Sequence, residues 1–430
     1  MLDFIILGIT TLFDLPRSPQ PDLQPLTVLA WEQSALFNLP QFDRDGLSSN
    51  IANNYLQNLT QQGFNRDRQG LWVQSGWDVS TNNLGETPLP AASLTKIATT
   101  LAALSKWNAK HQFPTNIYIT GKIENGVVTG DLIIQGNGDP LFVWEEAIAL
   151  GNELNRLGIK KIQGNILVTD KFYMNYESQS LVAGELFKEA INKNFWISTI
   201  TQQYLQMPVG TKQPEVAVTG EVKAIPRIPR NARLLIRHRS LPLAEILRQM
   251  NIYSNNKMAQ MLADSIGGAD TVAKTSAKIA NFPIAEIKLI NGSGLGEGNR
   301  ISPRAVCQML MAIDRLLPDN YSTADLFPTA GRDIVGTLQG RGLPRGTTIK
   351  TGTLDNVSAL AGVIPTSDRG NVYFSIINYG RPVQYLRREQ DSLINELAQS
   401  WQIIPSELNL PPEERWYLGN PQRNTVNNIN

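Results

Sequence analysis

The segment Pro90-Ala-Ala-Ser-Leu-Thr-Lys96 runs directly into Ile97-Ala-Thr-Thr-Leu-Ala-Ala-Leu104. The second part is apolar on several faces at helical spacing, which predicts a buried helix that begins close to Ser93. Residues three apart lie on one face of a helix, so the Ser93 hydroxyl and the Lys96 amine can meet. The backbone N–H groups at a helix N-terminus also favour a developing negative charge. The segment therefore predicts a nucleophilic serine with a lysine as its base.

Two later strings follow in order: Ser254-Asn-Asn256, and Lys350-Thr-Gly352 with Thr353 after it. By composition alone, a Ser-x-x-Lys string is expected about once or twice in a chain of this length. Indeed, Ser254-Asn-Asn-Lys257 fits that pattern as well. A Lys-Thr-Gly string is less common and is expected by chance in only about one chain in ten of this length. The prediction therefore depends on the order of the three strings and on the local structure around each.

The Lys-Thr-Gly string offers chemistry of its own at the end of a predicted strand. Gly352 lets a substrate lie against the strand edge, and a backbone N–H just after it can face a carbonyl oxygen. Lys350, Thr351 and Thr353 supply positive charge and hydroxyl groups suited to a terminal carboxylate. Lys350 is also the candidate cation that would help a buried Lys96 to lose its proton.

The composition limits the alternatives. Of the 430 residues, 42% are hydrophobic and 18% are charged, and the net charge is +1. Such a balance gives no electrostatic basis for binding nucleic acid, so nucleic acid is not an expected partner. The single cysteine, Cys307, excludes an intrachain disulfide. With only two histidines, a histidine base or a multi-histidine metal centre is not expected, and we predict neither a metal nor a cofactor.

The pattern of apolar residues predicts the main secondary structure. Helices are expected at 50–59, 97–104, 144–157, 243–250, 257–266, 303–316 and 384–401, and strands at 70–75, 347–351, 358–364 and 372–378. The chain between about residues 117 and 236 is rich in predicted strands, interrupted by the helix at 144–157. Helices packed on an antiparallel sheet indicate an α+β catalytic domain, with a strand-rich domain inserted into it.

The predicted organisation has five parts. Residues 1–26 form a possible signal or anchor and a linker, 27–106 the first part of the catalytic domain, 107–239 the insert, 240–403 the second part of the catalytic domain, and 404–430 a polar tail. The apolar segment Phe4–Phe13 has the length of a signal-peptide core and is too short to cross a bilayer. It predicts a cleaved signal or a weak membrane association, although Asp3 stands where a signal peptide favours positive charge; a mispredicted start is the alternative.

The strings and their surroundings resemble the class C penicillin-binding D-alanyl-D-alanine carboxypeptidases, peptidase family S13. The resemblance covers roughly Gly70 to Trp401. The segments that carry it are Pro90–Lys96, Gly130–Pro140, Ser240–Asn256, Asn291–Leu295 and Lys350–Gly362.

The resemblance implies a catalytic domain of the serine β-lactamase/DD-peptidase type and a serine DD-carboxypeptidase. Ser93 would be acylated by the penultimate D-alanine carbonyl of a peptidoglycan stem peptide, with Lys96 as general base. Ser254 would relay a proton to the leaving amine with Lys350 beside it, and Asn256 would bind the peptide backbone. Thr351 and Thr353 would hold the terminal carboxylate at Gly352, and the N–H groups of Ser93 and Thr353 would form the oxyanion hole. β-Lactam antibiotics would be inhibitors, and the location would be the periplasm or cell envelope.

Other interpretations stay open at this point. The insert looks shorter than in the larger family members, which leaves DD-endopeptidase action on cross-links undecided. A β-lactamase of class A type would add a Glu-x-x-x-Asn loop, but neither Glu286 nor Glu297 has asparagine four residues later. A non-catalytic envelope protein that keeps the fold is the third possibility, and the three intact strings argue against it. The glycine-rich segment 292–298 is expected to form a loop beside the active site and not a nucleotide cradle.

Overall fold

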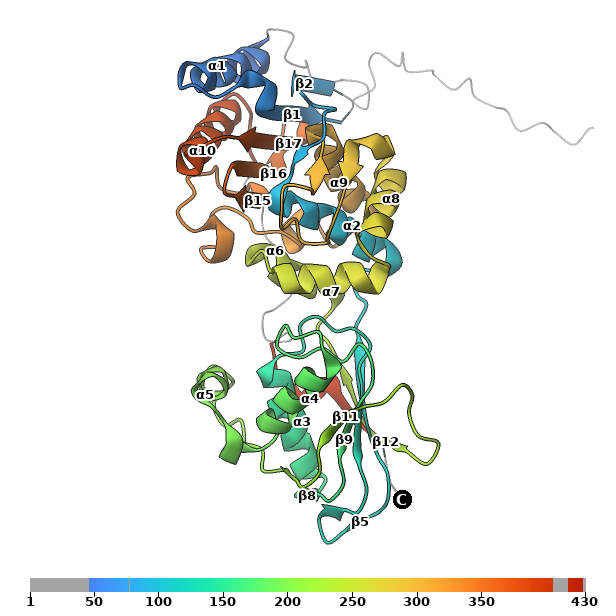
Figure 1. The fold of residues 1–430 in the computed structure, drawn as a ribbon. Coiled ribbons are helices and arrows are strands. Elements are labelled where there is room, and N and C mark those ends of the chain that lie inside the picture. The colour runs from blue at the N-terminus through green and yellow to red at the C-terminus, as the bar shows by residue number, and fades with distance from the viewer. Residues whose placement is uncertain (1–45, 77, 405–416, 428–430) are drawn as a thin grey trace, which may run out of the picture. The chain divides into compact units, whose positions relative to one another are not determined.

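The computed structural model describes residues 46–76, 78–404 and 417–427, which belong to one compact unit (Figure 1). The predicted signal or anchor segment at residues 1–26 lies outside these residues. None of the helices that the structure describes is long and apolar enough to cross a membrane.

The catalytic part is built around a five-stranded antiparallel sheet in the order β15-β16-β17-β1-β2. Its strands are β1 (Gln69–Ser75), β2 (Asp78–Asn83), β15 (Thr348–Leu354), β16 (Val357–Thr366) and β17 (Gly370–Tyr379). β1 pairs with β17 along its whole length, from Gln69 opposite Asn378 to Ser75 opposite Val372. The segments before and after the predicted insert therefore share one sheet.

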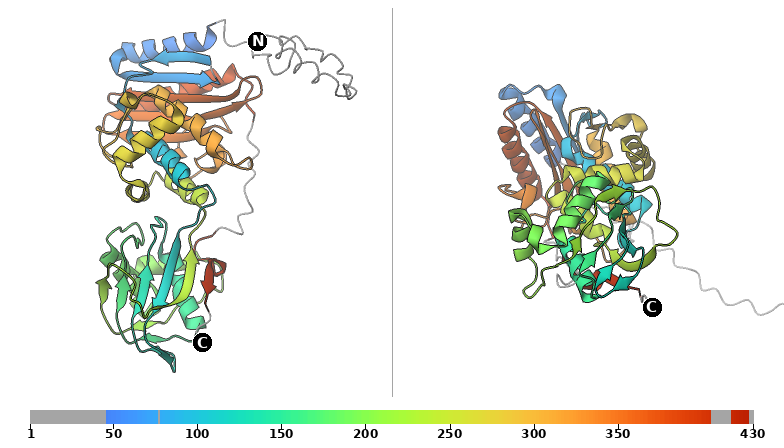
Figure 2. Two further views of the ribbon diagram at one scale, coloured as in Figure 1. Left: turned by 90° about the vertical axis from the view of Figure 1, so that its right-hand side faces the viewer. Right: turned by 60° about the horizontal axis from the view of Figure 1, so that its bottom comes forward.

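Helices cover both faces of this sheet (Figures 1 and 2). On one face lie α1 (Leu47–Gln61) and α10 (Val383–Gln399), and on the other lie α2 (Thr95–Lys106) and α9 (Pro303–Leu316). Successive side chains of a strand point to opposite faces. Accordingly, Leu71 and Val73 join the apolar cluster that contains residues of α1 and α10, whereas Trp72 joins the cluster of α2 and α9. The expected α+β fold with an antiparallel sheet and flanking helices is confirmed.

Further elements complete this part of the chain. They are α6 (Leu243–Ile252), α7 (Asn256–Ile266), α8 (Ala269–Ala280) and a small sheet in the order β13-β14-β3, formed by Ile287–Lys288, Arg300–Ile301 and Leu89–Pro90. Helix α8 was not predicted from the sequence. It packs Val272, Ala273 and Ala277 into the same apolar cluster as α2 and α9.

Residues between 114 and 239 build three helices and all but one strand of two sheets, around an apolar cluster that runs from Ile117 to Ile236. The strands of the six-stranded sheet, in the order β11-β9-β7-β4-β12-β18, include β4 (Pro114–Ile119), β7 (Leu132–Gln135), β9 (Ile166–Val168), β11 (Val222–Ala224) and β12 (Arg233–Arg239). The four-stranded sheet, in the order β10-β8-β6-β5, comprises β5 (Ile123–Glu124), β6 (Val127–Val128), β8 (Lys161–Ile162) and β10 (Ala217–Val218).

The insert holds more helix than the sequence indicated. Besides α3 (Trp144–Arg156), which was expected, it contains α4 (Ser180–Ala190) and α5 (Ser198–Leu205). Several neighbouring strands are parallel, among them β7 with β9 and β9 with β11. Parallel neighbours need long connections, and α3 lies in the connection between β7 and β9. The domain boundaries at residues 107 and 239 stay a prediction.

Part of the segment predicted as a polar tail, 404–430, has regular structure. Residues 417–427 fold against the insert, where β18 (Asn424–Val426) pairs antiparallel with β12. Arg423 explains this docking, because its guanidinium lies beside the buried carboxylate of Glu146 at 2.5 Å and donates to the backbone oxygen of Arg239 at 2.9 Å. A polar sequence can thus be well ordered when its charges are paired and hydrogen-bonded in the interior.

Replacing Arg423 with methionine is expected to lower the free energy of unfolding by about 3–5 kcal/mol, because Glu146 would keep a buried charge without its partner. Neighbouring His238 cannot replace the lost charge at neutral pH, since burial lowers the pKa of its imidazole. Urea unfolding of the variant beside wild type measures the difference. Arg230→Met, at an exposed position of the insert, is the matched control and should change stability by less than about 0.5 kcal/mol. A loss below about 1 kcal/mol for the Arg423 variant would contradict the argument.

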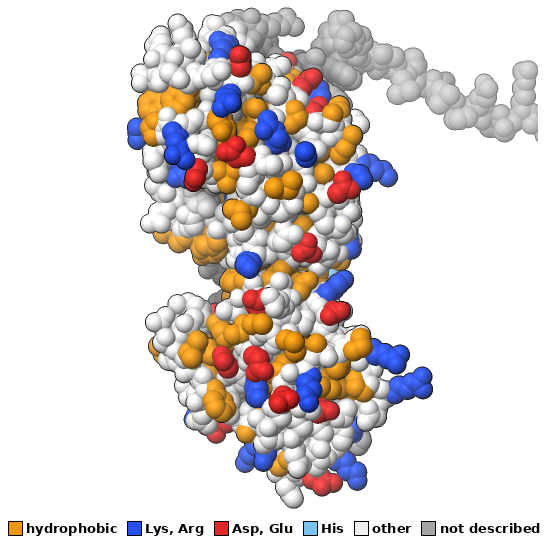
Figure 3. All heavy atoms as spheres, in the orientation of Figure 1, with side chains coloured by type: hydrophobic (Ala, Val, Ile, Leu, Met, Phe, Trp, Pro, Cys, Tyr) orange, Lys and Arg blue, Asp and Glu red, His pale blue; other side chains and the backbone are white. Residues whose placement is uncertain are grey.

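On the face seen in Figure 3, acidic and basic side chains are interspersed over the described residues, in keeping with the net charge of +1.

Candidate active site

Ser93 lies in a single 3₁₀ turn, η4 (Ala92–Leu94), which leads directly into α2. The residue before it, Ala92, has φ 47°, in the left-handed region that residues other than glycine seldom adopt. The loop around Gly294 supports this turn. A Cβ at Gly294 would lie 1.9 Å from the backbone oxygen of Ala92, so only glycine fits there. The serine is therefore held on a strained turn. The loop that holds it comes from far along the chain, and this places segment 292–298 beside Ser93, as expected.

Lys96 is fully buried, and its amine makes three hydrogen bonds. Nζ lies 3.0 Å from Ser93 Oγ, 2.7 Å from Asn256 Oδ1 and 2.7 Å from the backbone oxygen of Ser293. Burial lowers the pKa of the Lys96 amine to about 7. An amine with that pKa is substantially neutral near pH 7 and can accept a proton from the serine hydroxyl that it touches.

Ser254 and Lys350 form a second serine–lysine pair across the same site. Lys350 Nζ donates to Ser254 Oγ at 3.0 Å and to the backbone oxygen of Thr351 at 2.9 Å. Ser254 has φ 51°, again in the left-handed region, at the turn before α7. The side chain of Asn255 caps α7 by accepting from Met258 N, and Asn256 is the first residue of the helix. This turn directs the hydroxyl of residue 254 and the amide of residue 256 into one site.

The effect of one lysine on the pKa of the other runs in the opposite direction to the one that the sequence suggested. Lys350 was expected to help lower the pKa of Lys96, but burial alone accounts for that shift. The repulsion is felt instead at Lys350, whose pKa is lowered well below the usual lysine range by burial and then by the charge of Lys96. Both amines are thus held in a site that disfavours a second positive charge.

Gly352 lies where strand β15 passes the turn that carries Ser93. Because β15 is an outer strand of its sheet, its other edge can face this turn. A Cβ added to Gly352 would lie 3.0 Å from the backbone nitrogen of Ser93 and 3.0 Å from the backbone oxygen of Ala91. The strand edge and the start of α2 therefore approach closely only because residue 352 is glycine.

A cavity of about 500 Å³ opens over these groups. Five of the side chains predicted from the sequence line it, namely those of Ser93, Ser254, Asn256, Thr351 and Thr353. Lys96 and Lys350 lie beneath them and reach the cavity through their hydrogen bonds to the two serines. The structure thus brings all eight predicted site residues together from three distant segments of the chain.

A family model described as the D-Ala-D-Ala carboxypeptidase 3 (S13) family matches residues 53–188 and 175–400, which is more than half of the chain. The chain belongs to this family. The S13 assignment confirms the resemblance seen in the sequence and makes the protein a serine carboxypeptidase, a hydrolase.

Curated relatives and solved structures agree with the S13 assignment. The D-alanyl-D-alanine carboxypeptidase DacB of Haemophilus influenzae is 24% identical over 384 residues, which covers 66% of this chain and 79% of the relative. The D-alanyl-D-alanine carboxypeptidase of Actinomadura sp. (strain R39) is 24% identical over 434 residues, covering 76% and 79%. The structure of a penicillin G-acylated predatory endopeptidase from Bdellovibrio bacteriovorus, in complex with an immunity protein, superposes with a TM-score of 0.66 at 23% identity, covering 79% of this chain and 94% of that one. The last likeness shows that the fold is shared.

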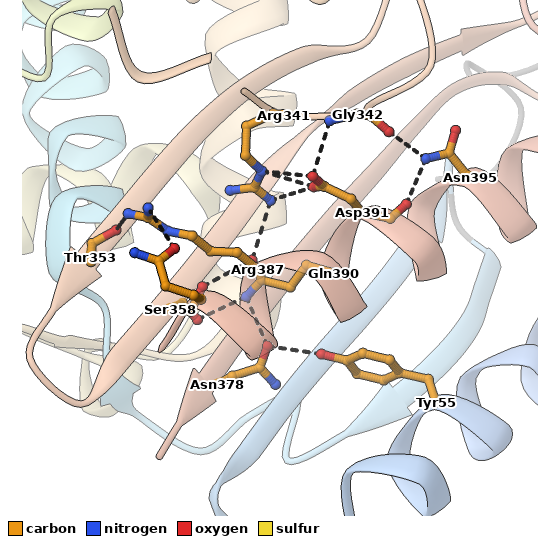
Figure 4. A network of polar contacts seen from close by, with 11 residues as sticks. Tyr55, Arg341, Gly342, Thr353, Ser358, Asn378, Arg387, Gln390, Asp391 and Asn395 are labelled. Atoms are coloured by element: carbon orange, nitrogen blue, oxygen red, sulfur yellow. Dashed lines mark hydrogen bonds and ion pairs between the residues drawn. The ribbon is translucent and has the colours of Figure 1, made fainter. Parts of the chain in front are cut away.

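Sequence reasoning missed two arginines of the S13 site. Arg341 and Arg387 both line the cavity, together with the short segment Gly336, Thr337 and Gln339. Arg341 comes from the loop before β15, and Arg387 projects from α10. Figure 4 shows both side chains beside Thr353, Gln390 and Asp391. Neither arginine belongs to one of the three strings, so no local signal in the sequence marked them.

Proposed function

We propose that this S13 enzyme is a DD-carboxypeptidase that removes the terminal D-alanine of peptidoglycan stem peptides through an acyl-enzyme on Ser93. The observation that carries the proposal is the contact of Lys96 Nζ with Ser93 Oγ at 3.0 Å, with the pKa of the amine lowered to about 7 by burial. A neutral base within hydrogen-bond distance of a hydroxyl is what nucleophilic catalysis by serine requires.

In the acylation step, Lys96 takes the proton of Ser93 as Oγ attacks the penultimate D-alanine carbonyl. The carbonyl oxygen becomes an oxyanion, for which the backbone N–H groups of Ser93 and Thr353 are the proposed donors. Ser254, hydrogen-bonded to Lys350, passes its proton to the nitrogen of the departing D-alanine and takes in its place the proton that Lys96 removed from Ser93. The C–N bond breaks, D-alanine leaves as a neutral amine, and the acyl group stays on Ser93 as an ester. Water then hydrolyses the ester and restores the serine.

The remaining predicted residues would bind the substrate. Thr351 and Thr353, whose side chains line the cavity, are proposed to hold the terminal carboxylate, while Gly352 lets the peptide lie along the edge of β15. Asn256 accepts a hydrogen bond from Lys96 with its side-chain oxygen, which leaves its amide N–H₂ free to donate to a peptide carbonyl.

β-Lactams would enter the same site as mimics of the D-Ala-D-Ala end and acylate Ser93. Slow release is expected, because the described residues that line the cavity include no carboxylate to activate a water. Glu286, one of the two glutamates considered for a β-lactamase, is hydrogen-bonded to Ser302 and paired with Arg304. Rapid hydrolysis of nitrocefin by the purified protein would overturn this and favour the β-lactamase interpretation.

We propose that the enzyme acts in the periplasm or cell envelope, where its proposed substrate lies. This location is part of the proposal, as is any weak membrane association through the N-terminal segment.

Mass spectrometry of products from purified muropeptides tests the proposed activity. The expected result is loss of one alanine from pentapeptide monomers, with no loss when Ser93→Ala replaces wild type. Separation of cross-linked dimers into monomers would show DD-endopeptidase action by the same acyl-enzyme chemistry, an activity named for the Bdellovibrio neighbour. Products unchanged from the substrate, with active reference enzyme in parallel, would refute both activities.

A further inference from the structure

The two arginines of the cavity differ in their partners. The guanidinium of Arg341 is paired with the carboxylate of Asp391, with Nε and Nη2 each within 2.9 Å of Oδ1, and the backbone N–H of Gly342 supports the same carboxylate at 3.1 Å (Figure 4). Arg387 makes no ion pair with any residue that the structure describes. Its hydrogen bonds go to neutral oxygens, those of Thr353 and Gln384. Of the two described arginines that line the cavity, only Arg341 is therefore neutralised by an ion pair.

The contact between Arg387 and Thr353 leaves the threonine ready to donate. Arg387 Nη2 donates to Thr353 Oγ1 at 2.5 Å. A hydroxyl that accepts from a guanidinium keeps its own hydrogen for another acceptor. An acceptor placed in the cavity would then meet the threonine O–H and the remaining guanidinium N–H groups together. A planar guanidinium with several donors is best matched by a carboxylate.

The electrostatics of Arg387 also favour an anion. The side chain is half-buried, and its pKa is lowered from the usual arginine range by desolvation and by the neighbouring Arg341, although Asp391 acts in the opposite direction. The negative charge of a carboxylate bound beside Arg387 would offset both unfavourable effects. The group remains a cation at neutral pH, because an arginine guanidinium does not lose its proton in that range.

Helix α10 holds Arg387 in place through residues one turn further along. Gln390 is buried and donates to the backbone oxygen of Ser358 at 3.0 Å and to Asn378 Oδ1 at 2.8 Å, which also accepts from Tyr55 (Figure 4). These bonds tie α10 to strands β16 and β17. A binding group on an element fixed in this way loses little conformational freedom when it meets its ligand.

We infer that Arg387, acting with Thr353, is a binding residue for the free α-carboxylate of the residue that leaves, and so selects substrates that end in an acid. This inference rests on the proposed function and deepens it, since it gives a role in substrate binding to a residue of α10, which lies outside the three motif strings. The positive charge of Arg387 accounts for a preference for a terminal carboxylate over a neutral terminal amide. The hydroxyls of Thr351 and Thr353 alone would bind these two groups more equally.

The test compares two synthetic peptides that end in D-Ala-D-Ala, one with a free carboxylate and one with a C-terminal amide. For Arg387→Gln we expect kcat/KM for the acid to fall about 10- to 100-fold, the usual effect of losing a charge-assisted hydrogen bond. The amide should change by less than about 3-fold, because it has no charge for Arg387 to pair with. Arg387→Lys, which keeps the charge, should retain more of the preference for the acid than Arg387→Gln.

Arg388→Gln is the matched control, because it removes one positive charge from the next position of the same helix. Arg388 is exposed and does not belong to the cavity lining described above. This variant should leave both peptides within about 2-fold of wild type.

The outcomes separate the inference from the proposed function. Equal loss on the acid and the amide would make Arg387 a merely structural residue and overturn the inference, as would an unchanged rate on the acid. In both cases hydrolysis by wild type would leave the proposed function standing. Wild type that cleaves neither peptide and takes up no penicillin would overturn the proposed function and the inference with it.

Discussion

Replacing Ser93 with alanine is expected to abolish covalent labelling by fluorescent penicillin and to lower DD-carboxypeptidase activity by at least about 10⁴-fold. The variant keeps the cavity, Lys96 and the second serine–lysine pair. It lacks Ser93 Oγ, the atom that Lys96 Nζ contacts at 3.0 Å in the wild type. Without that oxygen neither an acyl-enzyme nor a penicilloyl ester can form at this position. Labelling on a denaturing gel, followed by peptide mapping of the wild-type adduct, measures the effect directly.

The fold of the Ser93→Ala variant should survive, so that lost activity can be assigned to the missing hydroxyl. Lys96 keeps two of its three acceptors, Asn256 Oδ1 and the backbone oxygen of Ser293. We expect the free energy of unfolding to change by no more than about 1 kcal/mol. Ser198→Ala, at an exposed position at the start of α5, is the control variant and should label as wild type does.

Continued labelling of Ser93→Ala would contradict the assignment of the nucleophile. The adduct should then be sought on Ser254, which is hydrogen-bonded to Lys350, or on Ser293, which lies in the supporting loop. Absence of labelling in wild type would contradict the catalytic interpretation as a whole.

The sequence predicted four of the five strands of the catalytic sheet and most helices, because their apolar patterns are strong and their ends carry recognisable signals; strand β2, which is polar, was missed. The helix at 303–316 was predicted to the residue: Ser302 caps it with a hydrogen bond from Ala305 N, and Pro303 opens it. Helix α5 was missed for the opposite reason. It buries only Ile200, and its first turn contains the β-branched residues Thr199, Ile200 and Thr201, so neither periodicity nor propensity marks a helix there.

Helix α4 and the C-terminal strand show a second limit. Ala183, Phe187 and Ala190 lie at helical spacing in α4 and are buried, yet the strand-like segments on either side dominated the interpretation. Strand β18 is polar in sequence, and its order comes from pairing with β12 and from the contact of Arg423 with Glu146. Such long-range pairing leaves no periodic trace in the segment itself.

For the site, local spacing was enough only for the pair Ser93 and Lys96. The contact between Lys350 and Ser254 joins residues far apart in the chain, and the resemblance to a family predicted it where spacing could not. Arg387 illustrates what remained hidden. In the sequence it looks the same as its neighbour Arg388, and only the contacts of α10 with Thr353 of β15 and with β16 place one at the cavity and the other in solvent. The roles of the individual site residues stay predictions until variants are measured.

The acylation rate is expected to rise with pH through about 7 and to level off above about 8, because Lys96 acts as a base only when neutral. Burial lowers the pKa of its amine to about 7. Below that value the protonated fraction dominates, and kcat/KM should fall about tenfold per pH unit. Stopped-flow acylation by a chromogenic β-lactam, between about pH 5 and 9, follows the profile without interference from the slow hydrolysis of the ester.

Two variants show whether the fall in acylation rate below about pH 7, the acidic limb of the profile, is caused by protonation of Lys96. Lys96→Arg keeps the positive charge but cannot lose it, so acylation should fall by about 10³-fold or more across the range. Asp139→Asn removes a group outside the site whose pKa burial raises to about 7, and this variant should leave the fall in rate below pH 7 unchanged. If the limb disappeared in Asp139→Asn, or if Lys96→Arg acylated at the wild-type rate, Lys96 would not be the base. If the fall in acylation rate below pH 7 changes only when residue 96 is replaced, the pH dependence of the enzyme is caused by the burial of a single amine beside Ser93.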